Sequence, residues 1–253
     1  MIVAAAQFGS VPARIDTNVR TMGALVREAG ARLVVFAELA LTGYEPDRIA
    51  RDPGLWVAAD DPRLDPLREA CRAAGSAAVV NAPGPPRPGG RPGGGGRPGE
   101  RRPGGGRPFI TSYVIGPDGQ TLTRYDKRHL YEAEAEVFAA GDRDGRFTLD
   151  GHRFSLATCF DNHFAELGER AAADGCRVHL ASSLYGTGGG VQERATVYPA
   201  IARREGLFVV LANHVGPAGP WTGCGRSAVW GPDGELLAEA GPAEPGLARA
   251  EIP

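Results

Sequence analysis

Short apolar runs alternate with amphipathic segments along the first third of the chain. Residues 2–8 and 33–36 are apolar runs of strand length, and residues 17–29 between them repeat apolar side chains at helical spacing. A further helix is predicted at residues 64–74 and a further strand at residues 77–81. This alternation predicts an α/β layered domain that begins with a β-α-β unit.

The second half of the chain repeats this alternation. The pattern predicts helices at residues 165–174 and 192–205, and strands at residues 154–160, 178–182 and 207–213. The second half is therefore a stretch similar to the first.

Two hairpins of the same kind follow these two stretches. Residues 110–115 and 122–125 are strands joined by a Gly-Pro-Asp-Gly turn, and the same four residues join the strands 227–230 and 236–238. Since each hairpin ends a similar stretch, the pattern predicts a two-layer sheet core with pseudo-symmetric halves.

Residues 83–108 interrupt the pattern between two predicted strands. Of these 26 residues, 11 are Gly, 8 are Pro and 6 are Arg, so the segment has few side chains to bury. Such a composition is typical of a disordered or polyproline-like surface loop. We expect a low-complexity insertion within a single domain that covers residues 1–253, with an RNA-binding or membrane-attracted segment as the alternative.

Composition narrows the class of protein. The 253 residues are 42% hydrophobic and 23% charged, as in an ordinary globular protein. The net charge of -2 combines +5 from residues 83–108 with -7 from the rest, so the folded part does not favour nucleic-acid binding. Because no apolar run is long enough to span a membrane and the N-terminus lacks a basic signal-peptide start, we expect a soluble cytoplasmic protein and no membrane partner.

Lysine and cysteine usage points to candidate chemistry. Lys127 is the single lysine among 28 basic residues, which suggests a place where a compact ammonium is needed and a planar guanidinium does not fit. The four cysteines, Cys71, Cys159, Cys176 and Cys224, form no C-x-x-C pair, so neither a zinc site nor a disulfide framework is predicted.

Three reactive side chains stand at the ends of predicted strands. Glu38 follows residues 33–36, Lys127 follows residues 122–125, and Cys159 ends the apolar stretch before the helix at 165–174. Since ligands of α/β sheets bind beyond the strand ends, the three groups are predicted to meet at one site. A helix N-terminus or a nearby ammonium would favour the thiolate of Cys159 over the thiol.

The residues around these three positions resemble the motifs of the nitrilase superfamily, also called carbon-nitrogen hydrolases. They read F-A-E-L-A-L-T-G-Y from Phe36, Y-D-K-R-H-L from Tyr125, and C-F-D-N-H-F-A-E from Cys159. The likeness runs from Ile2 nearly to the C-terminus, interrupted only by residues 83–108. The resemblance implies an α/β four-layer α-β-β-α sandwich and an amidase-like enzyme that needs no cofactor and no metal.

The resemblance also implies catalytic roles. Glu38 would be the general acid and base, Cys159 the nucleophile that forms a thioester, and Lys127 the oxyanion donor together with the backbone N–H of Phe160. Glu134 would orient Lys127 or the water, with Glu132 and Glu136 as competing candidates. Tyr44, Asp161, His163, Ser183 and Tyr185 lie in or beside the matching motifs and are predicted, with Phe160, to line the substrate pocket.

The predicted substrate is a small linear amide or an N-carbamoyl compound. The same thioester also permits acyl transfer to an amine, and a catalytically silent binding or scaffold protein is the rival from another class. His129 and His214 raise a Cys-His protease as a further alternative, which the residues around Cys159 do not favour. The family pattern further implies a homodimer or a larger homo-oligomer.

Overall fold

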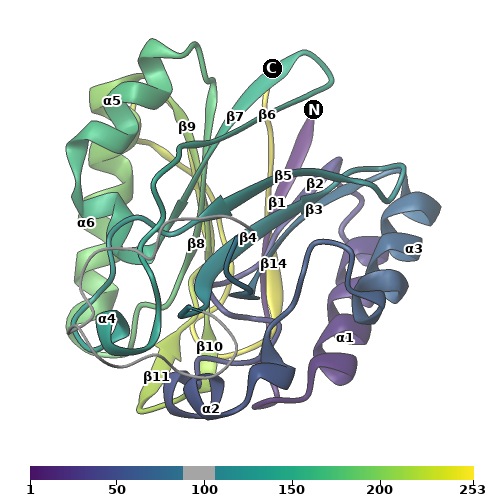
Figure 1. Ribbon diagram of the computed structural model, residues 1–253. Coiled ribbons are helices and arrows are strands. Elements are labelled where there is room, and N and C mark those ends of the chain that lie inside the picture. The colour runs from purple at the N-terminus through teal and green to yellow at the C-terminus, as the bar shows by residue number, and fades with distance from the viewer. Residues whose placement is uncertain (88–105) are drawn as a thin grey trace.

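The apolar strands build two six-stranded sheets that lie face to face between two pairs of helices (Figure 1). The computed structural model describes residues 1–87 and 106–253. Helices α1 (Ile15–Glu28) and α3 (Asp65–Ala74) cover the outside of one sheet, and helices α5 (Ala165–Ala173) and α6 (Gly189–Glu205) cover the outside of the other. The predicted α/β four-layer sandwich is confirmed.

The two sheets have the same strand order. The first is β14-β1-β2-β3-β4-β5 and the second, read from its opposite end, is β6-β7-β8-β9-β12-β13. In each sheet three parallel strands are followed by an antiparallel hairpin, and an antiparallel strand is added at the other edge. The pseudo-symmetric halves predicted from the hairpins are therefore present in the topology.

The strands of the first sheet are β1 (Ile2–Gln7), β2 (Leu33–Val35), β3 (Ala77–Gly84), β4 (Phe109–Ile115), β5 (Thr121–Asp126) and β14 (Gly246–Glu251). Those of the second are β6 (Gly145–Leu149), β7 (His152–Thr158), β8 (Val178–Ser183), β9 (Phe208–Asn213), β12 (Ala228–Trp230) and β13 (Leu236–Glu239). The short antiparallel ribbon of β10 (Val215–Ala218) and β11 (Trp221–Cys224) lies outside both sheets.

The central strands are buried on both faces, which explains why their sequences are continuous apolar runs. In β1, Val3 and Ala5 point toward the second sheet, where they share a core with Val178, whereas Ala4 packs on the helix side with Val19. Full burial of a Val or Leu side chain contributes about 1.5–3 kcal/mol, so the layer between the sheets is a major source of stability.

Strand β3 is longer than predicted. It continues to Gly84, and Pro83 and Gly84 pair with Ile110 and Phe109 of β4, so the first residues of the predicted loop 83–108 belong to the sheet. Proline is tolerated there because β2 pairs with β3 only as far as Val79, which leaves the Pro83 nitrogen without a neighbouring strand. The central part of that loop, residues 88–105, lies outside the described residues.

Several short elements had no pattern strong enough to predict. These are β6, the β10–β11 ribbon, β14, α2 (Pro46–Arg51), α4 (Glu134–Val137) and the 3-10 turns Pro53–Leu55, Pro62–Leu64 and Cys159–His163. The strand predicted at 154–160 also ends earlier, at Thr158. Within residues 1–87 and 106–253, no helix combines the length and the apolar character needed to cross a membrane.

Candidate active site

Glu38 lies in the turn that follows β2, and its backbone is held on both sides. The N–H of Leu39 donates to Asn81 Oδ1 at 2.6 Å, and His214 Nε2 donates to the carbonyl oxygen of Glu38. Burial lowers the pKa of His214 to about 4, so this ring is neutral. Leu39 has a φ of 48°, an uncommon value that these contacts maintain. These contacts therefore fix the turn after β2, and with it the backbone position of Glu38.

Lys127 follows β5 and is completely buried. Its Nζ lies 2.7 Å from Glu38 Oε1 and 2.8 and 3.0 Å from the two carboxylate oxygens of Glu134. Burial by itself lowers the pKa of Lys127, but the charges of Glu38 and Glu134 and the hydrogen bond to Glu134 raise the pKa above its ordinary value. The only lysine of the chain is thus a fixed ammonium between two carboxylates.

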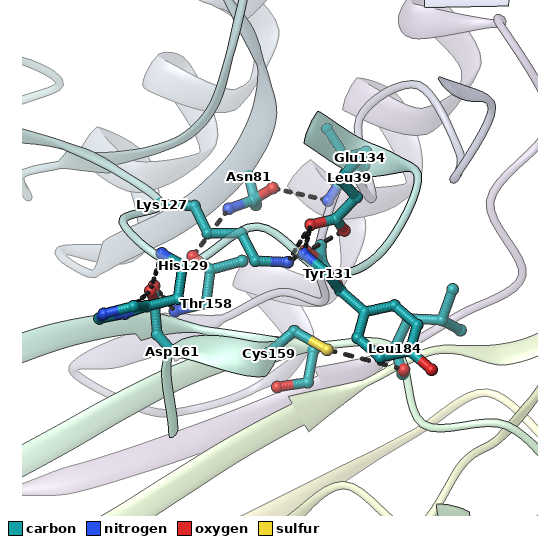
Figure 2. A network of polar contacts seen from close by, with 12 residues as sticks. Leu39, Asn81, Lys127, His129, Tyr131, Glu134, Thr158, Cys159, Asp161 and Leu184 are labelled. Atoms are coloured by element: carbon teal, nitrogen blue, oxygen red, sulfur yellow. Dashed lines mark hydrogen bonds and ion pairs between the residues drawn. The ribbon is translucent and has the colours of Figure 1, made fainter. Parts of the chain in front are cut away.

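Glu134 begins the short helix α4 and accepts two hydrogen bonds on each oxygen. Oε1 accepts from Lys127 and from the Tyr44 hydroxyl at 2.7 Å, and Oε2 accepts from Lys127 and from the Tyr131 N–H at 2.7 Å. Figure 2 shows the Glu134 carboxylate between Lys127 and Tyr131. The competing candidates Glu132 and Glu136 are exposed, so Glu134 is the residue of the three that contacts Lys127.

Cys159 is the first residue of the 3-10 turn after β7 and has a φ of 46°. This left-handed conformation is unusual for a residue with a side chain. The thiol donates toward the Leu184 carbonyl oxygen at 3.8 Å, as Figure 2 shows.

The thiol form of Cys159 is favoured. Burial raises its pKa well above the ordinary value, and the Glu38 charge adds to this, whereas Lys127 opposes it. The Lys127 ammonium lowers the pKa of the thiol, in the expected direction, but desolvation of the sulfur outweighs this attraction. The expected contribution of a helix N-terminus stays a prediction.

Asp161 joins the turn of Cys159 to the loop that follows Lys127. Its carboxylate accepts from the N–H of Thr158 at 2.9 Å, from the Tyr125 hydroxyl at 2.6 Å and from the backbone N–H groups of Arg128 and His129 at 3.1 and 2.8 Å. Figure 2 shows it beside His129 and Thr158. The side chain is fully buried and does not line the cavity, so the predicted contact of Asp161 with the substrate is wrong: its carboxylate bonds instead to the two loops that it joins.

A cavity of about 240 Å³ opens at Cys159. Of the predicted pocket residues, Tyr44, Phe160, His163 and Tyr185 line it. Ser183 does not: it is buried and shares a 2.8 Å hydrogen bond with the Tyr198 hydroxyl. The cavity wall also contains residues that were not predicted, on α6, on β11 and in the loop before α4: Glu193, Trp221 and Tyr131. No local sequence pattern identifies these three residues as part of the cavity wall, because the packing of their elements brings them there.

Glu38 differs from Glu134 in having an oxygen without a partner. Among the described residues its Oε2 is buried and accepts no hydrogen bond, while Glu38 lines the cavity. Burial raises the pKa of Glu38 to about 7; the Lys127 charge opposes this shift and the Glu134 charge adds to it. The site therefore holds a carboxyl group that can exchange a proton near neutral pH, next to a thiol.

The other three cysteines lie away from this cavity. Cys71, Cys176 and Cys224 are buried and unbridged, and burial raises the pKa of each thiol. Across the described ranges, no three His, Cys, Asp or Glu side chains are grouped closely enough to hold a metal ion.

Comparison with known proteins supports the resemblance seen in the motifs. The model of the carbon-nitrogen hydrolase family matches residues 2–253. A solved structure of the NitN amidase from Nesterenkonia sp. AN1 superposes with a TM-score of 0.83 at 30% identity, covering 100% of this chain and 93% of that one. Another structure of the Nesterenkonia amidase, with butyramide bound, has 29% identity, a TM-score of 0.83 and coverages of 100% and 91%.

Curated relatives match over shorter stretches. The 2-oxoglutaramate amidase of Bacillus subtilis is 31% identical over 146 residues, which is 57% of this chain and 56% of the relative. The omega-amidase of Homo sapiens is 29% identical over 149 residues, 54% of this chain and 53% of the relative. The match thus spans about half the length of these two relatives. Because the family model and the solved amidase structures cover essentially the whole chain, the protein belongs to the carbon-nitrogen hydrolase family, in the nitrilase superfamily.

Proposed function

We propose that this protein hydrolyses the carbon-nitrogen bond of small linear amides through a thioester on Cys159. The observation that carries the proposal is the buried ammonium of Lys127, held between Glu38 and Glu134 next to a cavity that opens at Cys159. A buried charge costs several kcal/mol unless it is paired, so a protein retains such a group where its charge is used.

In the first step, Glu38 Oε2 removes the proton from the Cys159 thiol while the sulfur attacks the amide carbonyl carbon. The C–S bond forms as the carbonyl double bond opens, and the negative charge moves to the carbonyl oxygen. The raised pKa of the thiol makes a base necessary, and the unpaired oxygen of Glu38 supplies one.

Lys127 Nζ and the N–H of Phe160 stabilise this oxyanion. The ammonium is already fixed by Glu134, so little reorganisation is needed when the charge develops. Both oxygens of Glu134 accept two hydrogen bonds each, which favours the orientation of Lys127 over the activation of water as the role of Glu134.

The intermediate then collapses to the thioester. Glu38 returns its proton to the nitrogen, the C–N bond breaks, and ammonia or an amine leaves. In the second half of the reaction Glu38 accepts a proton from water while the water oxygen attacks the thioester carbonyl carbon. As the C–S bond breaks, Glu38 gives that proton to the sulfur. The products are a carboxylic acid and the free thiol.

The size of the site supports a small substrate. The cavity of about 240 Å³ lies below the range of about 300–1,000 Å³ that is typical of drug-sized ligands. Butyramide and acrylamide are bound in structures of the Nesterenkonia amidase, which favours primary amides of similar length. N-carbamoyl compounds are the second substrate class to test.

The test is a screen for ammonia release from butyramide, acrylamide, N-carbamoyl amines and nitriles. We expect release from amides, its loss in Cys159→Ala, and a transient acyl adduct on Cys159 by intact mass. Cys176→Ala, which changes a buried thiol away from the cavity, is the matched control and is expected to keep the activity. Turnover of nitriles alone would overturn the amidase proposal.

The same assay separates the two alternative functions. Added hydroxylamine would divert the thioester to a hydroxamate, and a hydroxamate yield far above that of the acid would identify an acyl transferase. The absence of ammonia and of any adduct across the whole panel would favour a binding or scaffold protein.

A further inference from the structure

The entrance to the site is bordered by two adjoining cavities whose walls are acidic. The second cavity, of about 440 Å³, shares Tyr44, Tyr131, Glu134 and Trp221 with the first. Beyond Glu38 and Glu134, four carboxylates border the two cavities: Glu45, Asp47, Glu132 and Glu193. In the part of the chain that the structure describes, neither cavity is lined by an arginine or a lysine.

These carboxylates are only partly neutralised by neighbouring side chains. Glu193 lies 3.2 Å from His163 Nε2, and Asp47 lies 3.9 Å from Arg51, with both side chains of the latter pair mostly exposed. For Glu45 and Glu132, no basic side chain is within ion-pair distance in the described ranges. Since Lys127 is already balanced by Glu38 and Glu134, the described residues that line the two cavities together carry net negative charge.

Aromatic side chains line the same two cavities as these carboxylates. Trp221, on β11, is 48% exposed and borders both cavities, as does Tyr131, while Tyr185 lines the inner one. The face of an aromatic ring attracts a cation by about 0.5–2 kcal/mol, depending on its exposure. The entrance therefore combines the two kinds of group that recognise an organic cation: carboxylates and aromatic faces.

The orientation of a bound amide follows from the unpaired oxygen at the base of the inner cavity. Glu38 Oε2 is buried and has no described partner, and it lies with Cys159 at the cavity wall. An amide group placed there directs the rest of the molecule outward past Tyr131, Trp221 and Glu193. The end of the substrate farthest from the scissile bond then meets the acidic entrance.

We propose that this site selects amides whose far end carries a positive charge, such as an alkylammonium group, over amides with a neutral or carboxylate end. This inference rests on the proposed amide hydrolysis and names its substrate class. Ion pairing and cation–π attraction at a partly exposed site together favour the cation by about tenfold in kcat/KM. A carboxylate at the same position is disfavoured by repulsion.

Three amides of similar length test the selection: 4-aminobutanamide, pentanamide and succinamate. We expect kcat/KM for ammonia release to be about tenfold higher for 4-aminobutanamide than for pentanamide, and lowest for succinamate. Added NaCl should reduce the preference for the ammonium, because salt screens exposed charges. Equal or faster turnover of pentanamide or succinamate would overturn the inference while leaving amide hydrolysis intact.

A charge variant with a matched control locates the effect. Glu193→Gln should lower the ratio of kcat/KM between 4-aminobutanamide and pentanamide by about threefold or more. This is about the contribution of one exposed ion pair. Glu169→Gln removes the same charge from an exposed residue of α5 that lines neither cavity, and should leave the ratio unchanged. An equal effect of both variants would contradict the assignment to the entrance.

Binding separates failure of this inference from failure of the proposed function. If none of the three amides is hydrolysed, the proposed function fails, and their affinities for Cys159→Ala, measured by ligand-observed NMR, still test the selection. Tighter binding of 4-aminobutanamide than of the other two supports the inference, and the absence of that order overturns it.

Discussion

Glu38 and Glu134 carry the same chemical group and both contact Lys127, yet their surroundings give them different chemistry. Each oxygen of Glu134 accepts two hydrogen bonds, whereas one oxygen of Glu38 is buried and has no partner among the residues that the structure describes. Desolvation therefore acts on Glu38 with less compensation, and its pKa is raised to about 7. Glu38, the proposed base, therefore differs from Glu134 in its hydrogen-bond partners.

The pH dependence of kcat/KM is the first prediction at this scale. Glu38 must be ionised to accept the thiol proton, and its pKa is about 7, so we expect activity to rise with pH through about 7 and to be lost as the pH falls. The pKa values of Lys127 and Cys159 are both raised above their ordinary ranges, so no loss is expected up to about pH 9. Ammonia release measured across this range checks the profile, and a decline beginning near pH 8 would contradict it.

Lys127→Arg is the second prediction. A guanidinium is larger and planar, so it cannot occupy a fully buried site between two carboxylates without displacing the oxyanion contact. We expect kcat to fall by about 10²–10³, the effect of losing one oxyanion donor. Arg143→Lys, at a side chain that is 77% exposed, is the control and should change kcat little. Retention of most activity by Lys127→Arg would refute the proposed role.

At the element scale, the site is assembled from turns at strand ends that are tied to one another. The turn after β2 is held by Asn81 of β3 and by His214 after β9, while Asp161 ties the turn after β7 to the loop after β5. Of these five strands, β2, β3 and β5 belong to the first sheet, and β7 and β9 belong to the second. The relative position of Glu38, Lys127 and Cys159 thus depends on polar contacts that cross between the halves.

Asp161→Asn tests this tie. An amide presents an NH₂ where the carboxylate accepts hydrogen bonds, so at least one buried N–H donor loses its partner, which costs about 1–3 kcal/mol in the free energy of unfolding. We expect kcat to fall more than KM changes, because the cavity wall is retained while Cys159 shifts. Denaturant unfolding together with kcat and KM checks this. Asp174→Asn, at a partly exposed ion pair, is the control, and equal effects of the two variants would argue against a specific role for Asp161.

At the scale of the whole molecule, the two halves depend on each other for burial. Each sheet exposes an apolar face that only the other sheet covers, so neither half has a complete core alone. Strand β14 pairs with β1, so the first sheet contains a strand that follows the whole second sheet in the sequence. The single domain of residues 1–253, the homo-oligomer and the cytoplasmic location stay predictions.

Phe154→Ala tests the shared core. Phe154 is fully buried between the sheets and stacks on Phe147 at a ring-centroid distance of 4.7 Å. We expect its truncation to lower the free energy of unfolding by about 3–5 kcal/mol while circular dichroism and fluorescence report one coincident transition. Leu236→Ala, at a side chain that is 53% exposed, should change stability by about 0.5 kcal/mol or less. Two separate transitions would contradict a single cooperative domain.

Elements with long, regular patterns, and the reactive residues next to them, could be predicted from the amino-acid sequence alone. Buried strands need continuous apolar runs and the helices need one apolar face, so the layers, the two hairpins and the positions of Glu38, Lys127 and Cys159 at strand ends could all be predicted. Short elements such as β6, α4 and the β10–β11 ribbon could not, because few residues define them and tertiary contacts stabilise them.

Which polar residues line the cavity, and in which protonation state, follows from the three-dimensional packing of the elements. Asp161 and Ser183 stand in or beside the matching motifs but are buried in hydrogen-bond networks, whereas Glu193 and Trp221 come from distant elements and line the cavity. The thiol form of Cys159 likewise depends on its desolvation. The physical reason is that hydrophobic periodicity is local, while burial, hydrogen-bond partners and electrostatic fields arise from groups far apart in the chain.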